Sequence, residues 1–217
     1  MALSLFGHPF SSYCWKVQIA LYEKGLEFDY RILDPEHPEN MEEMLRHWPI
    51  FKFPLLLDDD RPVFESSIII EYLDGIAPEP RMIPADAALA LKVRHLDRVF
   101  DNYVMTPMQA VVANELREPG DRHPPSVKEA HDRLDQIYGW LDGQIGTQWA
   151  VGDIFTLADC AAAPSLFYAD WVRPIPDSCA NLKSYRQRLL QHPPVSRCVE
   201  LARPYRPFFP LGAPDRD

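Results

Sequence analysis

The stretch from Phe53 to Tyr72 constrains the fold of this chain most, because it contains the patterns of two strands and a helix without interruption. An apolar run at 55–57 has the length of a short strand, and the sequence Asp-Asp-Asp-Arg-Pro at 58–62 has the chemistry of a tight turn. A second extended segment follows, and Ser66 is a favourable first residue for the apolar helix after it. The stretch therefore predicts a β-hairpin that leads directly into a helix.

The same stretch has features that favour binding of an amino-acid group. If the Phe53–Pro54 bond is cis, the backbone of Phe53 is free to pair with something other than a strand. The free N–H groups and the Ser66 hydroxyl at the helix start attract a carboxylate, while Glu65 can hold an ammonium. A ligand with an α-amino acid end would satisfy both, although an ordinary turn and helix cap would use the same residues.

Composition narrows the class of protein. The 217 residues suit one large domain or two small ones, and the 47% apolar and 25% charged content is that of a soluble globular protein. The net charge of −10 argues against nucleic-acid or anionic-membrane partners, and no apolar run is long enough for a membrane span. The N-terminus does not resemble an export signal, and the cysteines show no CxxC spacing, so we expect free thiols in the cytoplasm.

Taken in order, the chain predicts a small α/β domain over 1–78 and an all-helical domain over 85–217. The expected elements of the first are a strand at 3–6, a helix at 15–24, a strand at 28–33, a short helix at 41–46 and the hairpin and helix at 53–73. The expected helices of the second are 85–116, kinked at Pro107 and with Leu89 inward, then 126–145, 156–172, 181–191 and 195–202, before an irregular proline-rich tail.

Ser11 and Ser12 lie between the first strand and the first helix, where hydroxyls and N–H groups favour an anion, although Ser also caps helices routinely. Metal chemistry is not indicated. The seven histidines have no metal-ligand spacing, and the three aspartates at 58–60 lack the glycine and distal Glu of a calcium loop.

Four segments together resemble the glutathione S-transferase family, in its order and at its spacing. They are Ser-Ser-Tyr-Cys-Trp-Lys-Val at 11–17, Lys-Phe-Pro at 52–54, Glu-Ser at 65–66 and Gly-Asp-Ile-Phe-Thr-Leu-Ala-Asp at 152–159. The combination is similar to the soluble serine-type branch, with bacterial, theta-like or zeta-like character. The resemblance implies a thioredoxin-like N-terminal domain, an all-helical C-terminal domain and a homodimer that uses glutathione as co-substrate, with no metal.

The resemblance also implies residue roles. Ser11 would donate a hydrogen bond to the glutathione sulfur, next to Ser12, and Phe53 would bind the cysteinyl part through its backbone, beside cis-Pro54. Lys52 would face the glycyl carboxylate, although Phe51 departs from the family's usual glycine in that loop. The γ-glutamyl end would lie at Glu65 and Ser66, with Asp101, or alternatively Asp97, on its amine.

The helical domain would supply a pocket for a small hydrophobic electrophile, which the enzyme would conjugate or isomerise, as in detoxification. Core packing is the alternative for each candidate. The candidates are Phe10, Tyr103, Met105, Met108, Phe167, Trp171, Phe208 and Phe209. Two other functions stay open: a binding protein that carries hydrophobic ligands without turnover, and glutathione-dependent thiol transfer at Cys14.

Overall fold

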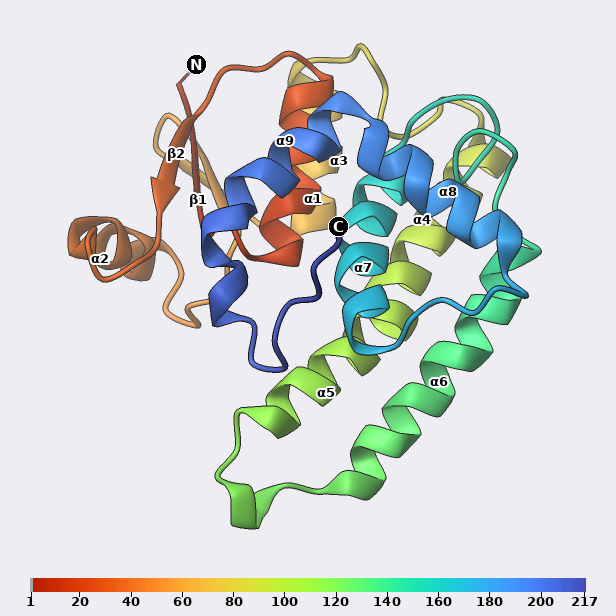
Figure 1. Cartoon of the computed structure of the whole chain (residues 1–217). Helices are drawn as coiled ribbons and strands as arrows, with labels where there is room; N and C mark the ends of the chain where they lie inside the picture. The colour runs from red at the N-terminus through yellow and green to blue at the C-terminus, as the bar shows by residue number, and fades with distance from the viewer. Residues whose placement is uncertain (1) are drawn as a thin grey trace.

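The computed structural model describes residues 2–217 and has an α/β domain followed by an all-helical domain, as predicted (Figure 1). Four strands of the described chain form one mixed sheet in the order β2-β1-β3-β4. β1 pairs in parallel with β2 and antiparallel with β3, and β3 and β4 form the predicted hairpin. The elements of this domain are β1 (Leu3–Gly7), α1 (Ser12–Glu23), β2 (Asp29–Ile32), α2 (Pro38–His47), β3 (Leu55–Asp58), β4 (Arg61–Phe64) and α3 (Ser66–Ile76).

Helix α1 is the central helix of the molecule. It contacts α3 of its own domain as well as α7 and α9 of the helical domain, and its Trp15 is fully buried. Gly25 ends the helix with φ 62°, a left-handed conformation that favours glycine, and Leu26 N donates to Leu21 O at 3.0 Å. Because α1 packs against both domains, the serine turn at its start lies where the two domains meet.

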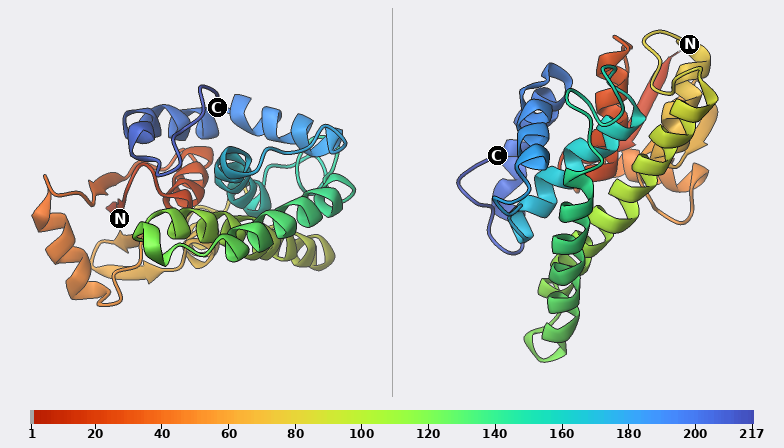
Figure 2. Two further views of the ribbon diagram at one scale, coloured as in Figure 1. Left: turned by 60° about the horizontal axis from the view of Figure 1, so that its bottom comes forward. Right: turned by 90° about the vertical axis from the view of Figure 1, so that its right-hand side faces the viewer.

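The helical domain is built around α7, which is buried from Leu157 to Trp171. Its start is held by Asp159, whose carboxylate accepts from Ala150 N at 2.8 Å, Thr156 N at 2.9 Å and Tyr185 Oη at 2.7 Å. Asp159 is therefore structural. The elements are α4 (Ala87–Val99), a π-helix (Phe100–Met105), α5 (Thr106–Glu115), a 3₁₀ turn (Pro119–Asp121), α6 (Pro124–Asp142), α7 (Leu157–Val172), α8 (Ala180–Gln191), α9 (Pro193–Ala202) and a second 3₁₀ helix (Arg203–Phe208). Figure 2 shows that α5 and α6 run side by side and project beyond the other helices.

The expected single helix over 85–116 is corrected by the structure. A π-helical segment, not a kink at Pro107, separates α4 from α5, and Pro107 falls in the first turn of α5, where its missing N–H costs little. Thr106 makes the wide turn by donating both its N–H and its hydroxyl to Asp101 O, the latter at 3.1 Å. Leu89, expected inward, is 46% exposed.

Other boundaries differ because proline is tolerated in the first turn of a helix. Helix α2 begins at Pro38 rather than at residue 41, and α6 begins at Pro124. The tail, expected to be irregular, contains the short 3₁₀ helix Arg203–Phe208, which accommodates two prolines. Within residues 2–217, every helix is too short or too polar to cross a lipid bilayer.

Candidate active site

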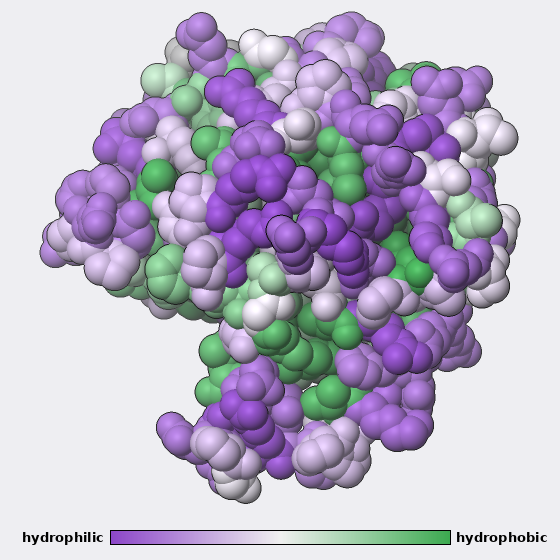
Figure 3. All heavy atoms as spheres, viewed as in Figure 1, coloured by the Kyte–Doolittle hydropathy of each residue, from purple (hydrophilic) through white to green (hydrophobic). Residues whose placement is uncertain are grey.

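A cavity of about 870 Å³ lies between the start of α1, the loop before β3, α5 and the C-terminal segment. Figure 3 shows hydrophobic surface gathered where the α5–α6 pair leaves the rest of the molecule. The lining residues are His8, Phe10, Ser11, Ser12, Tyr13, Phe51, Lys52, Phe53, Met108, Gln109, Val112, Ala113, Leu116, Tyr168, Phe208, Phe209 and Pro210. The cavity thus joins a polar wall from the α/β domain to a largely apolar wall from the helical domain.

The serine turn is held firmly at the polar wall. Ser11 is the N-cap of α1, and its Oγ accepts from Cys14 N at 3.4 Å, which is a long contact. The turn before it is fixed by Trp15 Nε1, which donates to Pro9 O at 2.6 Å, and by Tyr168 Oη, which donates to Phe10 O at 3.0 Å. The Ser11 hydroxyl proton is therefore available to an acceptor in the cavity, next to the positive end of α1.

The loop before β3 presents backbone groups to the same cavity. The Phe53–Pro54 peptide bond is cis, and the backbone N–H and C=O of Phe53 have no hydrogen-bond partner among residues 2–217. Lys52 is exposed at the rim, and Phe51 adopts φ 53°. A peptide-like ligand can pair with Phe53 here in the manner of an added strand.

Glu65 and Ser66 form the start of α3, as the sequence predicted, but neither lines the cavity beside Ser11. Glu65 has φ 67°, which is uncommon for a residue with a side chain and costs about 1–2 kcal/mol. Its carboxylate is exposed and does not cap the helix, and the hydroxyl of buried Ser66 has no hydrogen-bond partner among the described residues. The helix start therefore offers unpaired groups of both kinds to a zwitterionic end.

Beneath this helix start, a buried charge cluster joins the two domains. Lys16 on α1 is 1% exposed, and its Nζ lies 2.5 Å from Asp97 Oδ1, 2.8 Å from Asp101 Oδ2 and 2.9 Å from Ser67 Oγ. Arg98 Nη2 donates to Asp101 Oδ2 at 2.6 Å and to Asp97 Oδ2 at 2.7 Å. Burial raises the pKa of Asp101, and the charge of Lys16 partly offsets this. Two cations therefore already pair with Asp97 and Asp101.

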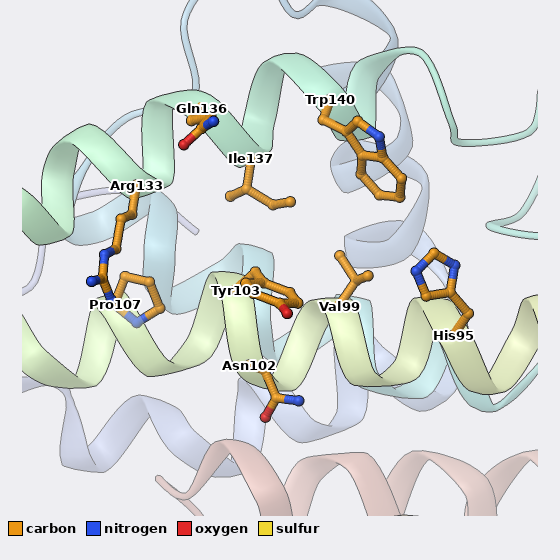
Figure 4. A pocket seen from close by; sticks show the side chains of 9 residues that line it. All are labelled: His95, Val99, Asn102, Tyr103, Pro107, Arg133, Gln136, Ile137 and Trp140. Atoms are coloured by element: carbon orange, nitrogen blue, oxygen red, sulfur yellow. The ribbon is translucent and has the colours of Figure 1, made fainter.

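The structure brings four of the eight predicted pocket residues to the cavity. Phe10, Met108, Phe208 and Phe209 line it, and Phe208 is 75% exposed. The other four lie elsewhere, and for these the structure corrects the expectation. Met105 and Phe167 are buried in the core, and Trp171 is 9% exposed behind Phe10 and Phe209. Tyr103 lines a different cavity, of about 680 Å³, between α4 and α6, opposite Ile137 (Figure 4).

Sequence reasoning missed several lining residues. Tyr13 follows the two serines directly, and burial together with the charge of Asp101 raises its pKa to about 12. Gln109, Val112 and Leu116 extend the wall that Met108 begins. Their spacing of three and four residues was a usable signal, because it places them on one face of a helix.

Cys14 lies directly beneath the serine turn and does not line the cavity. It is fully buried, and its Sγ would clash with a Cβ built on Gly7. Burial raises the pKa of the thiol to about 11. A thiol in this position is protonated at neutral pH and shielded from disulfides.

Two protein-family models match the chain. One, described as the glutathione S-transferase N-terminal domain, matches residues 5–81, and the other, the C-terminal domain, matches residues 99–193. Glutathione S-transferase 1 of Dianthus caryophyllus is 31% identical over 175 residues, which cover 76% of each chain. A stringent starvation protein A homolog of Coxiella burnetii is 28% identical over 165 residues, covering 76% of this chain and 75% of the relative.

Solved structures show the same likeness. A glutathione S-transferase of Methylobacterium radiotolerans, in complex with glutathione sulfonate, superposes with a TM-score of 0.79 at 28% identity, over 92% of this chain and 95% of the other. Ure2p in complex with glutathione has a TM-score of 0.80 at 18% identity, over 92% and 93% of the two chains, and shares the fold.

Proposed function

The chain belongs to the glutathione S-transferase family, and from this we propose that it is a transferase that activates glutathione for attack on a small hydrophobic electrophile. One observation carries the proposal. A single cavity holds the Ser11 hydroxyl at a helix N-terminus on one wall and Met108, Phe208 and Phe209 on the other. A thiolate held at Ser11 would therefore face an apolar chamber in which an electrophile is desolvated beside it.

In this proposal glutathione lies along the edge of the α/β domain. The backbone of Phe53 pairs with the cysteinyl residue, and Lys52 meets the glycyl carboxylate. Glu65 and Ser66 receive the γ-glutamyl end, because an exposed carboxylate and the free N–H groups of α3 match its ammonium and carboxylate. Asp101 remains a candidate for the amine, provided that Arg98 gives way.

The energies required for thiol activation are modest. A free thiol has a pKa of about 8.5, and lowering it by ~2 units needs about 2.7 kcal/mol. A hydrogen bond to a charged group contributes roughly 1.5–3 kcal/mol, and a helix N-terminus about 0.3–1 kcal/mol. Ser11 and the start of α1 together suffice without a general base. The thiol proton passes to water, and the thiolate forms a bond to the electrophilic carbon as the bond to a leaving group breaks. With an epoxide or an unsaturated carbonyl, the displaced electron pair takes a proton from water instead, and in an isomerisation the thiolate is expelled again after the adduct rearranges.

The direct test combines turnover with binding. We expect the purified protein to conjugate members of a panel of aryl halides, epoxides and unsaturated carbonyls with glutathione, and Ser11→Ala to lose most of that rate while it still binds glutathione in calorimetry. If the wild-type protein binds no glutathione, the proposal is wrong.

A non-catalytic binding protein is the second candidate function. The relatives at 28–31% identity include both a protein named as a transferase and one named for stringent starvation, so membership alone does not establish turnover. Glutathione binding without turnover of any electrophile in the panel would favour this candidate. Thiol transfer at Cys14 is disfavoured by its full burial. Treatment with oxidised glutathione should leave the intact mass unchanged.

We also propose that the protein is a cytoplasmic homodimer. All four cysteines are unpaired, which suits a reducing compartment. Ile68 on α3 is 55% exposed, and Leu91 on α4 is 70% exposed. Ile68 lies one turn before Glu71, and Leu91 lies one turn before Arg94. Glu71 and Arg94 form an ion pair that joins the two helices. This apolar pair is a suitable contact for a second copy. Light scattering should give the mass of a dimer, and Leu91→Glu should shift it toward that of a monomer.

A further inference from the structure

His8 lines the cavity beside Ser11, and the proposed reaction leaves this side chain without a role. The residue directly follows β1, and its carbonyl oxygen accepts a hydrogen bond from Ser11 N at 2.9 Å. His8 and Ser11 therefore begin and end one tight turn, so their Cα atoms are less than about 7 Å apart. The imidazole and the Ser11 hydroxyl thus belong to the same wall of the cavity.

One hydrogen bond fixes the tautomer of His8. Phe10 N donates to His8 Nδ1 at 3.1 Å. Because a backbone N–H can only donate, Nδ1 is the unprotonated nitrogen, and the proton of the neutral ring is on Nε2. Burial lowers the pKa of His8, and the charge of Asp34 opposes this shift only in part, so the ring is neutral at neutral pH. His8 is therefore a neutral imidazole with a single N–H group.

The Nε2–H group is held in position without an acceptor of its own. Nε2 forms no hydrogen bond or ion pair with residues 2–217. The bond at Nδ1 orients the ring from the turn, and Tyr205 supports it from the C-terminal segment, dark blue in Figure 1, by an edge contact with centroids 4.6 Å apart. Phe208 and Phe209 of the same segment line the cavity with apolar surface. A fixed, unpaired donor therefore borders the chamber in which the electrophile would react.

This tautomer excludes one chemical role and permits another. Nδ1 is occupied and Nε2 is protonated, so His8 has no free lone pair with which to take a proton from Ser11 or from a thiol. The Nε2–H group can instead donate a hydrogen bond to an oxygen that becomes negative during the reaction. A donor that is already in place stabilises such charge without reorganisation at the moment of reaction.

We propose that His8 binds the oxygen of the electrophile and that the substrates are accordingly α,β-unsaturated carbonyl compounds, an inference that rests on the proposed transferase function. The thiolate at Ser11 forms a C–S bond at the β-carbon as the C=C electron pair shifts toward the carbonyl oxygen. The resulting enolate takes a proton from water at its α-carbon, and His8 keeps its own proton. The attacked carbon and the oxygen of these compounds lie at opposite ends of a conjugated unit, which suits two donors one turn apart. In an epoxide the same two atoms are bonded directly.

The first test measures binding and requires no turnover. The glutathione adduct of methyl vinyl ketone differs from S-butylglutathione only by a carbonyl in place of a methylene group. We expect the ratio of their affinities in calorimetry to fall about fivefold in His8→Phe, as for loss of one neutral hydrogen bond. His8→Asn should lower the ratio equally. Its amide can still accept from Phe10 N in an Asx turn but does not extend to the position of Nε2.

The second test measures turnover with two electrophiles. For benzylideneacetone, an unsaturated ketone, kcat/KM should fall about tenfold to hundredfold in His8→Phe, because the donor then faces a developing negative charge. Benzyl chloride carries no oxygen, so its kcat/KM should change little. His123→Phe is the matched control, because His123 is exposed and does not line the cavity beside Ser11. It should leave both the affinity ratio and the rates unchanged.

The two tests separate failure of this inference from failure of the proposed function. An unchanged affinity ratio in both His8 variants would overturn the role of His8, and so would an equal loss of rate with both electrophiles. A wild-type protein that binds both conjugates but turns over neither electrophile would not be a transferase, and the affinity ratio would still decide whether His8 binds the oxygen. Failure to bind either conjugate would overturn both proposals.

Discussion

Replacing Ser11 with alanine removes one hydroxyl that the structure leaves free to donate into the cavity. Its only contact as an acceptor, from Cys14 N, is long at 3.4 Å, so loss of the cap should cost about 0.5 kcal/mol in stability, the low end for such a substitution. Loss of the donor to a bound thiolate should cost roughly 1.5–3 kcal/mol. That corresponds to a rise of about 1–2 units in the pKa of bound glutathione and a tenfold to hundredfold slower reaction at neutral pH.

The assay is the pH dependence of kcat/KM with an aryl halide, together with calorimetry of glutathione binding. The wild-type profile should rise to a plateau near the pKa of the bound thiol. The profile of Ser11→Ala should have the same shape, displaced upward in pH, and should approach the wild-type rate at high pH. Glutathione affinity near pH 5, where the thiol is protonated in both proteins, should change little.

Ser12→Ala is the control, because Ser12 lies in the same turn but is 8% exposed and is not the N-cap. It should alter glutathione affinity without moving the pH profile. An undisplaced profile in Ser11→Ala would refute the reasoning, and so would equal displacement in both variants.

Three further predictions rest on single contacts. Lys16→Met should lower the free energy of unfolding by about 3–5 kcal/mol in urea titration, because it leaves Asp97 and Asp101 buried without that cation; Lys16→Arg should recover part of the loss. Gly7→Ala should destabilise the protein by ~1–3 kcal/mol through its clash with Cys14, and Cys14→Ala in the same chain should restore much of it in thermal melts. Burial raises the pKa of Cys14 to about 11, so the thiol of the unfolded chain ionises at a lower pH than that of the folded protein. The free energy of unfolding should therefore fall as the pH rises from about 8.5 toward 11. Cys14 should also react with iodoacetamide far more slowly in the native protein than in urea.

Local patterns in the sequence predicted the parts of the site that are local in the chain. Ser11 caps α1, because a helix cap depends only on residues within one turn. The hairpin and the start of α3 at Ser66 followed from the turn chemistry between them. The cis bond at Pro54 was implied by the family resemblance and not by the local pattern, which left it as a condition. The other features depend on neighbouring residues, which a sequence displays directly.

The pocket could be predicted only in part, because the π-helical segment alters the helical phase. A regular helix advances about 100° per residue, and the wider turn at Phe100–Met105 shifts every later side chain relative to that count. Met105 consequently faces the core, and Tyr103 faces α6. The partners of Lys16 were likewise out of reach, since Ser67 and Asp101 are 51 and 85 positions away.

The ionic cluster around Lys16 also bears on how this fold can be recombined. The Lys16 ammonium belongs to the first domain, whereas the Asp97 and Asp101 carboxylates belong to the second. Each domain alone therefore lacks part of the charge that neutralises its buried ionic groups. A chimera that joins this α/β domain to the helices of a relative must also carry acidic residues at the position of Asp97 on α4 and at the position of Asp101 in the π-helical segment. Without these acids, the chimera would bury the Lys16 ammonium at the domain interface without a carboxylate partner. A chimera that exchanges whole domains would then fail to fold, whereas one that exchanges only surface loops would fold.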